Sequence, residues 1–167
     1  MERFKRFLFL LTNDTEIKEI IKFSKSLKEK FGDNIENDLV YVKNLEIYEK
    51  LPLTIQGLGV VNNTVDLAKE YRTIENDKYN DYYIQLEPYF RKVYTLEGTI
   101  LDVVLEELKA YDLLVVCKND GNRLSDNLNG LLKYHYKPMI ILSNTDTDYN
   151  FDNILMLNDG GYRVNTT

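Results

Sequence analysis

Between Lys92 and Leu142 the chain reads KVYTLEGTILDVVLEELKAYDLLVVCKNDGNRLSDNLNGLLKYHYKPMIIL. Three short apolar runs, at 93–96, 112–117 and 138–142, alternate with two segments whose apolar residues have helical spacing. Runs of this kind are typical of strands in a parallel sheet, because helices cover both faces of such a sheet. Ligands bind these sheets at the carboxyl ends of the strands, where the strand order reverses. The stretch therefore predicts an α/β domain and limits the search for a site to a few loops.

The N-terminal part of the chain adds a strand, a helix and a second strand. Residues 8–11 and 38–42 are the predicted strands, and Asn13 or Asp14 is predicted to cap the helix between them. The predicted apolar face of this helix consists of Ile17, Ile20, Ile21, Ser24, Leu27 and Phe31, and its polar face of Lys18, Glu19, Lys22 and Lys25.

A long connection and a long helix follow. Residues 44–63 read as the connection, and residues 64–90 have helical spacing with a predicted break near Asn76 and Asp77. We interpret the aromatic stripe of this helix as packing surface rather than as a platform for a nucleobase. Thr99 and Asp102 predict a cap for the next helix. The complete prediction is one doubly wound domain of five strands and four helices.

Length and charge exclude several classes of protein. The 167 residues suit one domain, and 27 acidic against 21 basic residues give a net charge of −6 without a basic cluster, which argues against a nucleic-acid partner. No apolar run reaches the roughly 20 residues of a membrane helix, and no signal peptide is recognisable. The single cysteine excludes an intramolecular disulfide. We expect a cytoplasmic protein with no membrane partner.

The last part of the chain differs from what precedes it. We expect residues 1–145 to form the α/β domain, and residues 146–167 to form a linker and an extra strand. Residues 154–160 repeat the pattern of residues 8–14, an apolar run followed by an Asn-Asp pair. Two interpretations stay open: the extra strand joins an edge of the sheet, or it starts a truncated second copy of the domain.

Three segments carry a resemblance to a known family. They read EGTI at 97–100, AYDLLVV at 110–116 and KPMIIL at 137–142. Over residues 6–144 the chain resembles the universal stress protein family, in which a glutamate-glycine turn precedes the third helix, an aspartate opens the fourth strand and a proline leads the fifth. The resemblance implies a five-stranded parallel sheet of order 3-2-1-4-5 flanked by helices, similar to the adenine nucleotide alpha hydrolases.

The resemblance also implies a place for a nucleotide. ATP-binding members have the pattern Gly-x2-Gly-x9-Gly-Ser/Thr after the fourth strand, whose glycines let backbone donors approach phosphates. The matching positions here are Cys117, Asp120, Gly130 and Leu131. Only the third glycine is kept, and the carboxylate of Asp120 would repel phosphate. Gly121 and Asn122 offer a shifted version of this degenerate loop.

The first two strands supply the other nucleotide contacts that the resemblance implies. The family's first-strand aspartate matches either Thr12 or Asp14; we favour Asp14, for which a helix cap is an equally good interpretation. Val42 would offer backbone groups to a base. The candidate nucleotide-binding residues are Thr12, Asp14, Val42, Cys117, Gly121, Asn122 and Gly130.

Other chemistry finds little support in the sequence. Cys117 lies beside Lys118, which is compatible with a redox sensor, but a plain buried thiol is favoured. His135 is the only histidine and is interpreted as a charge at a helix end, which leaves no multi-histidine metal site. No nucleophile elbow, Walker loop or dinucleotide fingerprint occurs. We therefore predict neither catalytic nor metal-binding residues.

The resemblance implies a domain that acts in stress response by binding and dimerisation, and the degenerate loop predicts weak or no ATP binding and no cofactor. A homodimer would form through the fifth-strand edge at Met139, Ile140 and Ile141, or a tandem second domain would take that place. The alternative is an adenine-nucleotide-binding member that uses ATP with magnesium and has a very slow ATPase activity.

Overall fold

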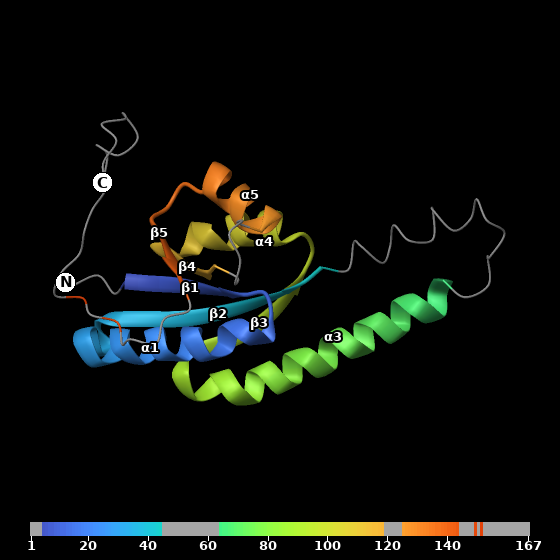
Figure 1. Cartoon of the computed structure of the whole chain (residues 1–167), viewed down its shortest axis with the longest axis horizontal. Coiled ribbons are helices and arrows are strands. Elements are labelled where there is room, and N and C mark those ends of the chain that lie inside the picture. Colours follow the sequence, from blue (N-terminus) through green and yellow to red (C-terminus); the bar gives the residue numbers. More distant parts are fainter. Residues whose placement is uncertain (1–4, 45–63, 119–124, 144–148, 150, 152–167) are drawn as a thin grey trace.

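The computed structural model describes residues 5–44, 64–118, 125–143, 149 and 151. Its centre is a parallel sheet of five strands in the order β3-β2-β1-β4-β5 (Figure 1). The strands are β1 (Lys5–Leu11), β2 (Ile35–Lys43), β3 (Lys92–Glu97), β4 (Leu113–Cys117) and β5 (Met139–Leu142). This topology confirms the predicted doubly wound sheet.

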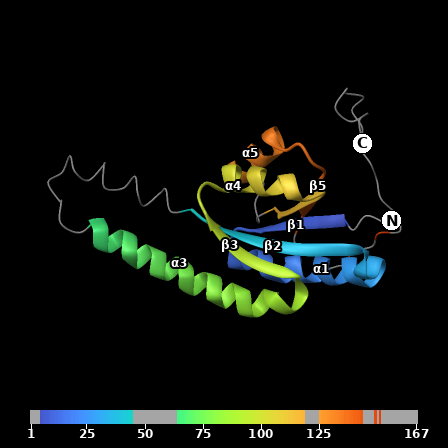
Figure 2. The ribbon, with the colours of Figure 1, turned by 180° about the vertical axis from the view of Figure 1, so that it is seen from behind.

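Helices cover both faces of the sheet. Figures 1 and 2 show α1 (Ile17–Phe31) and α3 (Thr64–Leu86) on one face, with α4 (Ile100–Glu107) and α5 (Asp126–Tyr134) on the other. Short 3-10 turns extend or join these elements: η1 (Asp14–Glu16), η2 (Gly32–Asn34), η4 (Glu87–Tyr89) and η5 (Leu108–Ala110). No described helix is both long enough and apolar enough to cross a bilayer.

Successive residues of a strand face opposite helical layers, which explains why the strand sequences are apolar without alternation. Phe9 and Leu11 of β1 pack toward α1 and α3, whereas Leu8 and Leu10 pack toward α4 and α5. All four side chains are buried. A shift of register by one residue would exchange the two sets, so packing on both faces specifies the pairing of β1 with β2 and β4.

Side-chain caps begin the helices at the positions that the sequence indicates. Asn13 Oδ1 accepts a hydrogen bond from the backbone N–H of Thr15 at 3.0 Å, which resolves the choice between Asn13 and Asp14. Thr99 Oγ1 accepts from the N–H of Asp102 at 3.2 Å and donates to its carboxylate at 2.6 Å. Both caps satisfy backbone donors that a helix start leaves free.

The long helix differs from the prediction. α3 is continuous from Thr64 to Leu86, so the break predicted near Asn76 and Asp77 is wrong. Asn and Asp have low helix propensity, but here tertiary contacts offset it. Lys43 Nζ donates to Asn76 Oδ1 at 2.6 Å, and Tyr41 donates to the carboxylate of Glu75, also at 2.6 Å. These contacts fasten the middle of α3 to β2.

Two residues beyond β5 pack on α1. The ring of Tyr149 meets Phe23 edge-on with centroids 4.8 Å apart, and the ring of Phe151 lies 5.6 Å from that of Phe23 and 5.7 Å from that of Phe31. Two side chains that follow the fifth strand in sequence therefore cover part of α1. The strand predicted at 154–160 lies outside the described residues.

Candidate functional site

The strand order reverses at the carboxyl ends of β1 and β4, which we call the switch point. β1 pairs with β2 on one side and with β4 on the other. The helix that follows β1 lies on one face of the sheet, and the helix that follows β4 lies on the opposite face (Figure 1). Because the two connections diverge here, this is the expected ligand position in a sheet of this type.

A buried carboxylate occupies the end of β1. Glu16 is 4% exposed. Its carboxylate accepts hydrogen bonds from the backbone N–H of Thr12 at 2.8 Å, from the Thr12 hydroxyl at 2.5 Å and from the Asn13 side-chain amide at 3.2 Å. Burial raises the pKa of Glu16, although the hydrogen bonds from Thr12 and Asn13 oppose that shift. The donors at the end of β1 are thus satisfied from within the chain.

A second carboxylate lies on the same side of the sheet. Glu19 is 6% exposed, so its predicted place on the polar face of α1 is wrong. It accepts a hydrogen bond from the hydroxyl of Tyr149, which lies 130 positions along the chain. Burial and the hydrogen bond to Glu19 raise the pKa of Tyr149. A charged residue on a helix becomes buried here because a remote tyrosine covers it.

The thiol of Cys117 ends β4 in an unfavourable environment for a thiolate. Burial raises the pKa of Cys117, and the carboxylates of Glu16 and Glu19 raise it further. The half-buried side chain packs against the core on the α1 and α3 side of the sheet. A redox-sensing cysteine needs a lowered pKa, so this environment agrees with a plain thiol.

The structure brings some of the candidate nucleotide-binding residues together and separates others. Thr12 follows β1, Val42 lies near the end of β2, and Cys117 ends β4, so these three residues share the carboxyl edge of the sheet. Val42 is buried against the α4 and α5 layer, whereas Cys117 faces the other layer. Asp14 is exposed in η1, and its charge acts on Tyr82 of α3.

The remaining candidates belong to the connection after β4 and to α5. Gly121 and Asn122 lie outside the described residues. Gly130 lies within α5, where a Cβ added to it would be 3.6 Å from the Leu101 side chain of α4, an ordinary packing distance. Its position suits close packing of two helices, and a role in nucleotide binding stays a prediction.

Sequence reasoning missed the two acids that dominate the switch point. From the sequence alone, Glu16 is an acidic residue in the first turn of a helix, where it favours the positive helix end. The three-residue spacing between the capping residue Asn13 and Glu16 is that of a capping box, and it is the signal that could have revealed that this carboxylate turns back toward the chain before the helix. For Glu19 there is no local signal. Among the described residues, no three His, Cys, Asp or Glu side chains form a group that could hold a metal ion.

A different polar network lies at the amino-terminal edge of the sheet. The side chain of Asp38 is 1% exposed and pairs with Arg91, while Arg6 Nη2 lies 3.5 Å from the same carboxylate oxygen. The hydroxyl of Tyr111 donates to Asp38 at 2.9 Å, and the guanidinium of Arg6 lies 4.7 Å from the centre of the Tyr111 ring. This network joins β1 and β2 to the residues that precede β3 and β4, at the edge opposite the switch point.

No protein-family model matches the sequence, and no curated protein matches it. Solved structures do match. The hypothetical protein MJ0577 has 16% sequence identity and a TM-score of 0.57, with 86% of this chain and 99% of that chain covered. A protein of the universal stress protein family from Burkholderia pseudomallei has 10% identity and a TM-score of 0.52, with 83% and 96% covered. This chain has the fold of a universal stress protein.

A further member of the universal stress protein family, from Arabidopsis thaliana, was solved with AMP bound. It has 12% identity and a TM-score of 0.48, with 89% of this chain and 97% of that chain covered. At these identities the similarity to universal stress proteins concerns the fold. What this chain binds has to be argued from its own residues.

Proposed function

We propose that this chain is a universal-stress-type domain that acts by binding and association and binds ATP weakly or not at all. The observation that carries the proposal is the carboxylate of Glu16, which takes up the N–H and hydroxyl of Thr12 at the end of β1. An anionic ligand at the switch point would have to displace this carboxylate before it could use those donors.

The surrounding charge supports the same conclusion. Glu16 and Glu19 are both buried near the end of β4, where their carboxylates act on Cys117. A phosphate charge about 4 Å from one of them would be opposed by about 4 kcal/mol at the effective dielectric constant typical near a protein surface. A neutral ligand would escape this repulsion.

The alternative is an adenine-nucleotide-binding domain that uses ATP with magnesium and hydrolyses it very slowly. The observation in its favour is that Thr12, Val42 and Cys117 share the carboxyl edge of the sheet. In this alternative, the connection that contains Gly121 and Asn122 holds the phosphates, and Gly130 supports them.

Calorimetric titration of the full chain with ATP and magnesium, alongside thermal unfolding, separates the two functions. We expect no saturable heat and no thermal shift at ATP concentrations up to about 1 mM. Saturable binding in the micromolar range would establish the alternative. Gly130→Ala is the matched variant: if Gly130 only packs against Leu101, this change leaves the ATP titration unaltered and stabilises α5 by about 0.5–1 kcal/mol.

The surface that we propose for association is the outer edge of β5, with which no other strand of the described part of the chain pairs. Ile141 on this strand is 39% exposed. An edge strand presents unpaired N–H and C=O groups that a second copy of the strand can pair with. A tandem second domain would use the same edge.

Size-exclusion chromatography with light scattering tests this association. We expect the wild type to be a dimer and Ile141→Lys to be a monomer, because a lysine at the interface leaves a charge without water. Ile84→Lys is the control, since Ile84 is exposed on α3. A wild type that is monomeric at all concentrations would contradict a homodimer.

A further inference from the structure

Helix α1 holds two aromatic side chains that follow the sheet in sequence. The ring of Tyr149 meets that of Phe23 edge-on with centroids 4.8 Å apart, and the ring of Phe151 lies 5.7 Å from that of Phe31. Phe31 is still 41% exposed, so the aromatic surface of α1 extends beyond what Phe151 covers. We call the surface that receives the two rings the α1 dock, which consists of Glu19, Lys22, Phe23 and Phe31.

The two aromatic residues are an addition to the domain rather than part of its framework. The five strands and the described helices lie between residues 5 and 142, so the sheet and the helices that cover it precede Tyr149 in sequence. The residues that join β5 to Tyr149 read SNTDTD at 143–148 and include no apolar residue, a composition typical of connections. A segment attached in this way can bind its own domain or the same surface of another copy.

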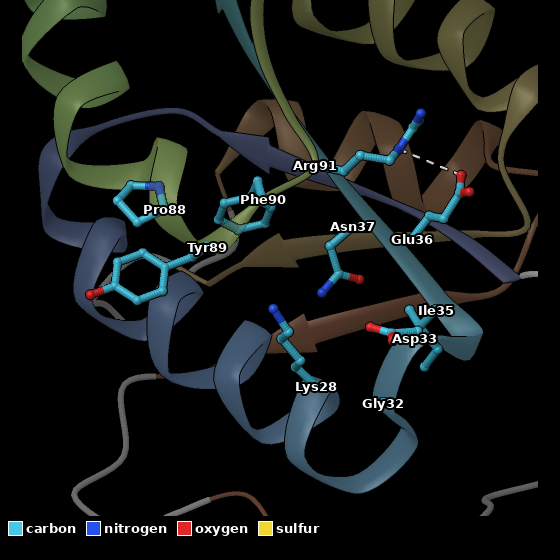
Figure 3. A pocket seen from close by; sticks show the side chains of 10 residues that line it. All are labelled: Lys28, Gly32, Asp33, Ile35, Glu36, Asn37, Pro88, Tyr89, Phe90 and Arg91. Atoms are coloured by element: carbon cyan, nitrogen blue, oxygen red, sulfur yellow. Dashed lines mark ion pairs between the residues drawn. The ribbon is translucent and has the colours of Figure 1, made fainter.

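A second tyrosine that contacts α1 is held in a different way. The ammonium of Lys25 lies 4.8 Å from the centre of the Tyr89 ring, and Ser24 Oγ donates to the backbone oxygen of Tyr89 at 3.0 Å. Figure 3 shows Tyr89 and the core residue Phe90 beside a cavity of about 290 Å³. In the described part of the chain, Tyr149 contacts α1 through its side chain. Contacts of this kind can exchange without disturbing the backbone of the sheet.

The carboxylate of Glu19 makes the α1 dock specific for tyrosine. Glu19 is buried and accepts a hydrogen bond from the Tyr149 hydroxyl. Burial of a carboxylate costs free energy that a donor has to offset, and an apolar residue would avoid this cost in a contact that never opens. Glu19 instead requires a ring that carries a hydroxyl, so the dock distinguishes tyrosine from phenylalanine.

Charge favours an acidic partner at the same surface. Three lysines of α1 have the spacing i, i+4 and i+7 of one helical face, namely Lys18, Lys22 and Lys25. The ammonium of Lys22 lies 5.4 Å from the centre of the Tyr149 ring. In the sequence, aspartates at positions 146, 148 and 152 flank Tyr149 and Phe151. Opposite charges of this kind steer two surfaces together and are screened by salt.

We propose that the α1 dock binds Tyr149 and Phe151 of a second copy of this chain in exchange for its own. The hydroxyl of the incoming Tyr149 donates to Glu19 and its ring packs on Phe23, while the incoming Phe151 covers Phe31. The exchange replaces each contact by an identical one, as in domain swapping. A second copy fits because it has the same hydroxyl, ring spacing and acidic neighbours. This association is independent of the β5 edge.

A peptide with the sequence of residues 144–153, NTDTDYNFDN, tests the recognition by fluorescence anisotropy. It should bind the full chain carrying Tyr149→Ala and Phe151→Ala with a Kd below about 1 mM. The wild type should bind it severalfold more weakly, because its own residues compete at an effective concentration on the order of 1 mM. Tyr149→Phe, which loses a single hydroxyl and retains the fold, should lie between the two. Equal affinity of the three proteins, or no saturable binding at about 10 mM peptide, would overturn the proposal.

A double-mutant cycle tests the role of Glu19. A peptide carrying Tyr149→Phe should bind the alanine variant about tenfold more weakly than the unchanged peptide, because it lacks the donor to a charged group. With Glu19→Gln in the protein, this loss should shrink to about threefold or less. An undiminished loss would show that the hydroxyl does not meet Glu19 and would overturn the assigned contact.

Two complementary copies test the exchange between chains. A labelled acceptor copy carries Tyr149→Ala and Phe151→Ala, and a donor copy carries Phe31→Glu, which weakens its own dock at an exposed position. Both carry Ile141→Lys, so association through β5 does not contribute and its failure would leave this test unaffected. We expect the acceptor's anisotropy to rise with the donor, but not with a donor that also lacks Tyr149 and Phe151. The same anisotropy with both donors would contradict the exchange.

Discussion

At the scale of single residues, the side chain that depends most on its hydrogen-bond donors is the carboxylate of Asp38. Its carboxylate is almost fully buried, and one of its oxygens, Oδ1, has no hydrogen-bond partner among the residues that the structure describes. Asp38 therefore depends on the donors that reach Oδ2: Arg91, Arg6 and the hydroxyl of Tyr111. A buried carboxylate that loses a donor keeps its desolvation cost, so this network is sensitive to single substitutions.

Tyr111→Phe is the gentlest test of this network, because it removes only the hydroxyl. We expect the free energy of unfolding to fall by about 2 kcal/mol, the usual value of a hydrogen bond to a charged group. Urea unfolding measures the change. Tyr134→Phe is the control, since Tyr134 is 53% exposed and should lose almost nothing. Equal stability of the two variants would show that Asp38 does not need the Tyr111 donor.

Cys117 gives a second test at this scale. Because burial and two carboxylates raise the pKa of its thiol, the thiolate fraction near neutral pH is smaller than in the unfolded chain. Each unit of pKa lowers that fraction about tenfold. We expect an aromatic disulfide reagent to react at least about tenfold more slowly with the native protein than with the protein in urea. Faster native labelling would restore the redox-sensor interpretation.

Local sequence predicted some residues of the site and not others, and the reason is the distance to their partners. Asn13 and Thr99 could be recognised as caps because they bond to residues two and three positions away. The burial of Glu19 depends on Tyr149, and the pairing of Asp38 depends on residues of other strands. Such contacts exist only once the sheet has formed, so no local pattern reveals them.

At the scale of elements, the turn between β3 and α4 is the most constrained connection. Gly98 has a φ of +143°, and a Cβ added to it would lie 2.9 Å from the Val103 side chain. Its N–H also donates to the backbone oxygen of Lys43 at 3.1 Å, which ties the turn to the end of β2. The turn therefore requires glycine on two grounds, backbone conformation and space.

Gly98→Ala should consequently destabilise the domain by about 2 kcal/mol or more, because both backbone strain and a steric clash contribute. Gly32→Ala is a matched comparison: Gly32 has a φ of +60°, but nothing lies within 4 Å of its added Cβ. We expect a smaller loss there, because only backbone strain contributes. Chemical denaturation measures the free energy of unfolding of both variants. An equal loss of stability would mean that the Val103 side chain moves away from the added Cβ at no cost.

The central strands β1, β2 and β4 were the most predictable elements, because they are largely buried between the two helical layers and their apolar runs can be recognised without knowledge of the neighbours. The helices were predictable where one apolar face dominates, as in α1. α3 was harder because its middle is held by polar contacts from Glu75 and Asn76 to β2. In the sequence, polar residues in the middle of a helix suggest that the helix is interrupted there. In the fold, the side chains of Glu75 and Asn76 bind α3 to β2.

At the scale of the whole molecule, the buried carboxylates make stability depend on pH in opposite directions. Burial alone would raise the pKa of Glu75, but hydrogen bonds from Lys78 and Tyr41 outweigh it and hold the pKa below the ordinary value of 4.5. Glu75 therefore stabilises the fold above that value and loses this contribution as the pH falls. The raised pKa of Glu16 acts in reverse, favouring the fold at low pH.

Glu75→Gln should therefore make the free energy of unfolding less dependent on pH in the acidic range. We expect the variant to lose less stability than the wild type between about pH 6 and pH 3, because it has no carboxylate to protonate there. Urea midpoints measured across this range report the difference. Asp77→Asn, an exposed position on the same helix, should keep the slope of the wild type. A Glu75→Gln profile parallel to that of the wild type would contradict the assignment.

The position of Tyr149 and Phe151 on α1 has a consequence for the order of events during synthesis. α1 leaves the ribosome well before Tyr149 and Phe151 do, because the aromatic rings that cover Phe23 and the hydroxyl that donates to Glu19 belong to residues made more than a hundred positions later. Until they emerge, the nascent helix exposes an aromatic edge beside a carboxylate without its partner. Nascent chains with this kind of exposure are the ones that holding chaperones protect.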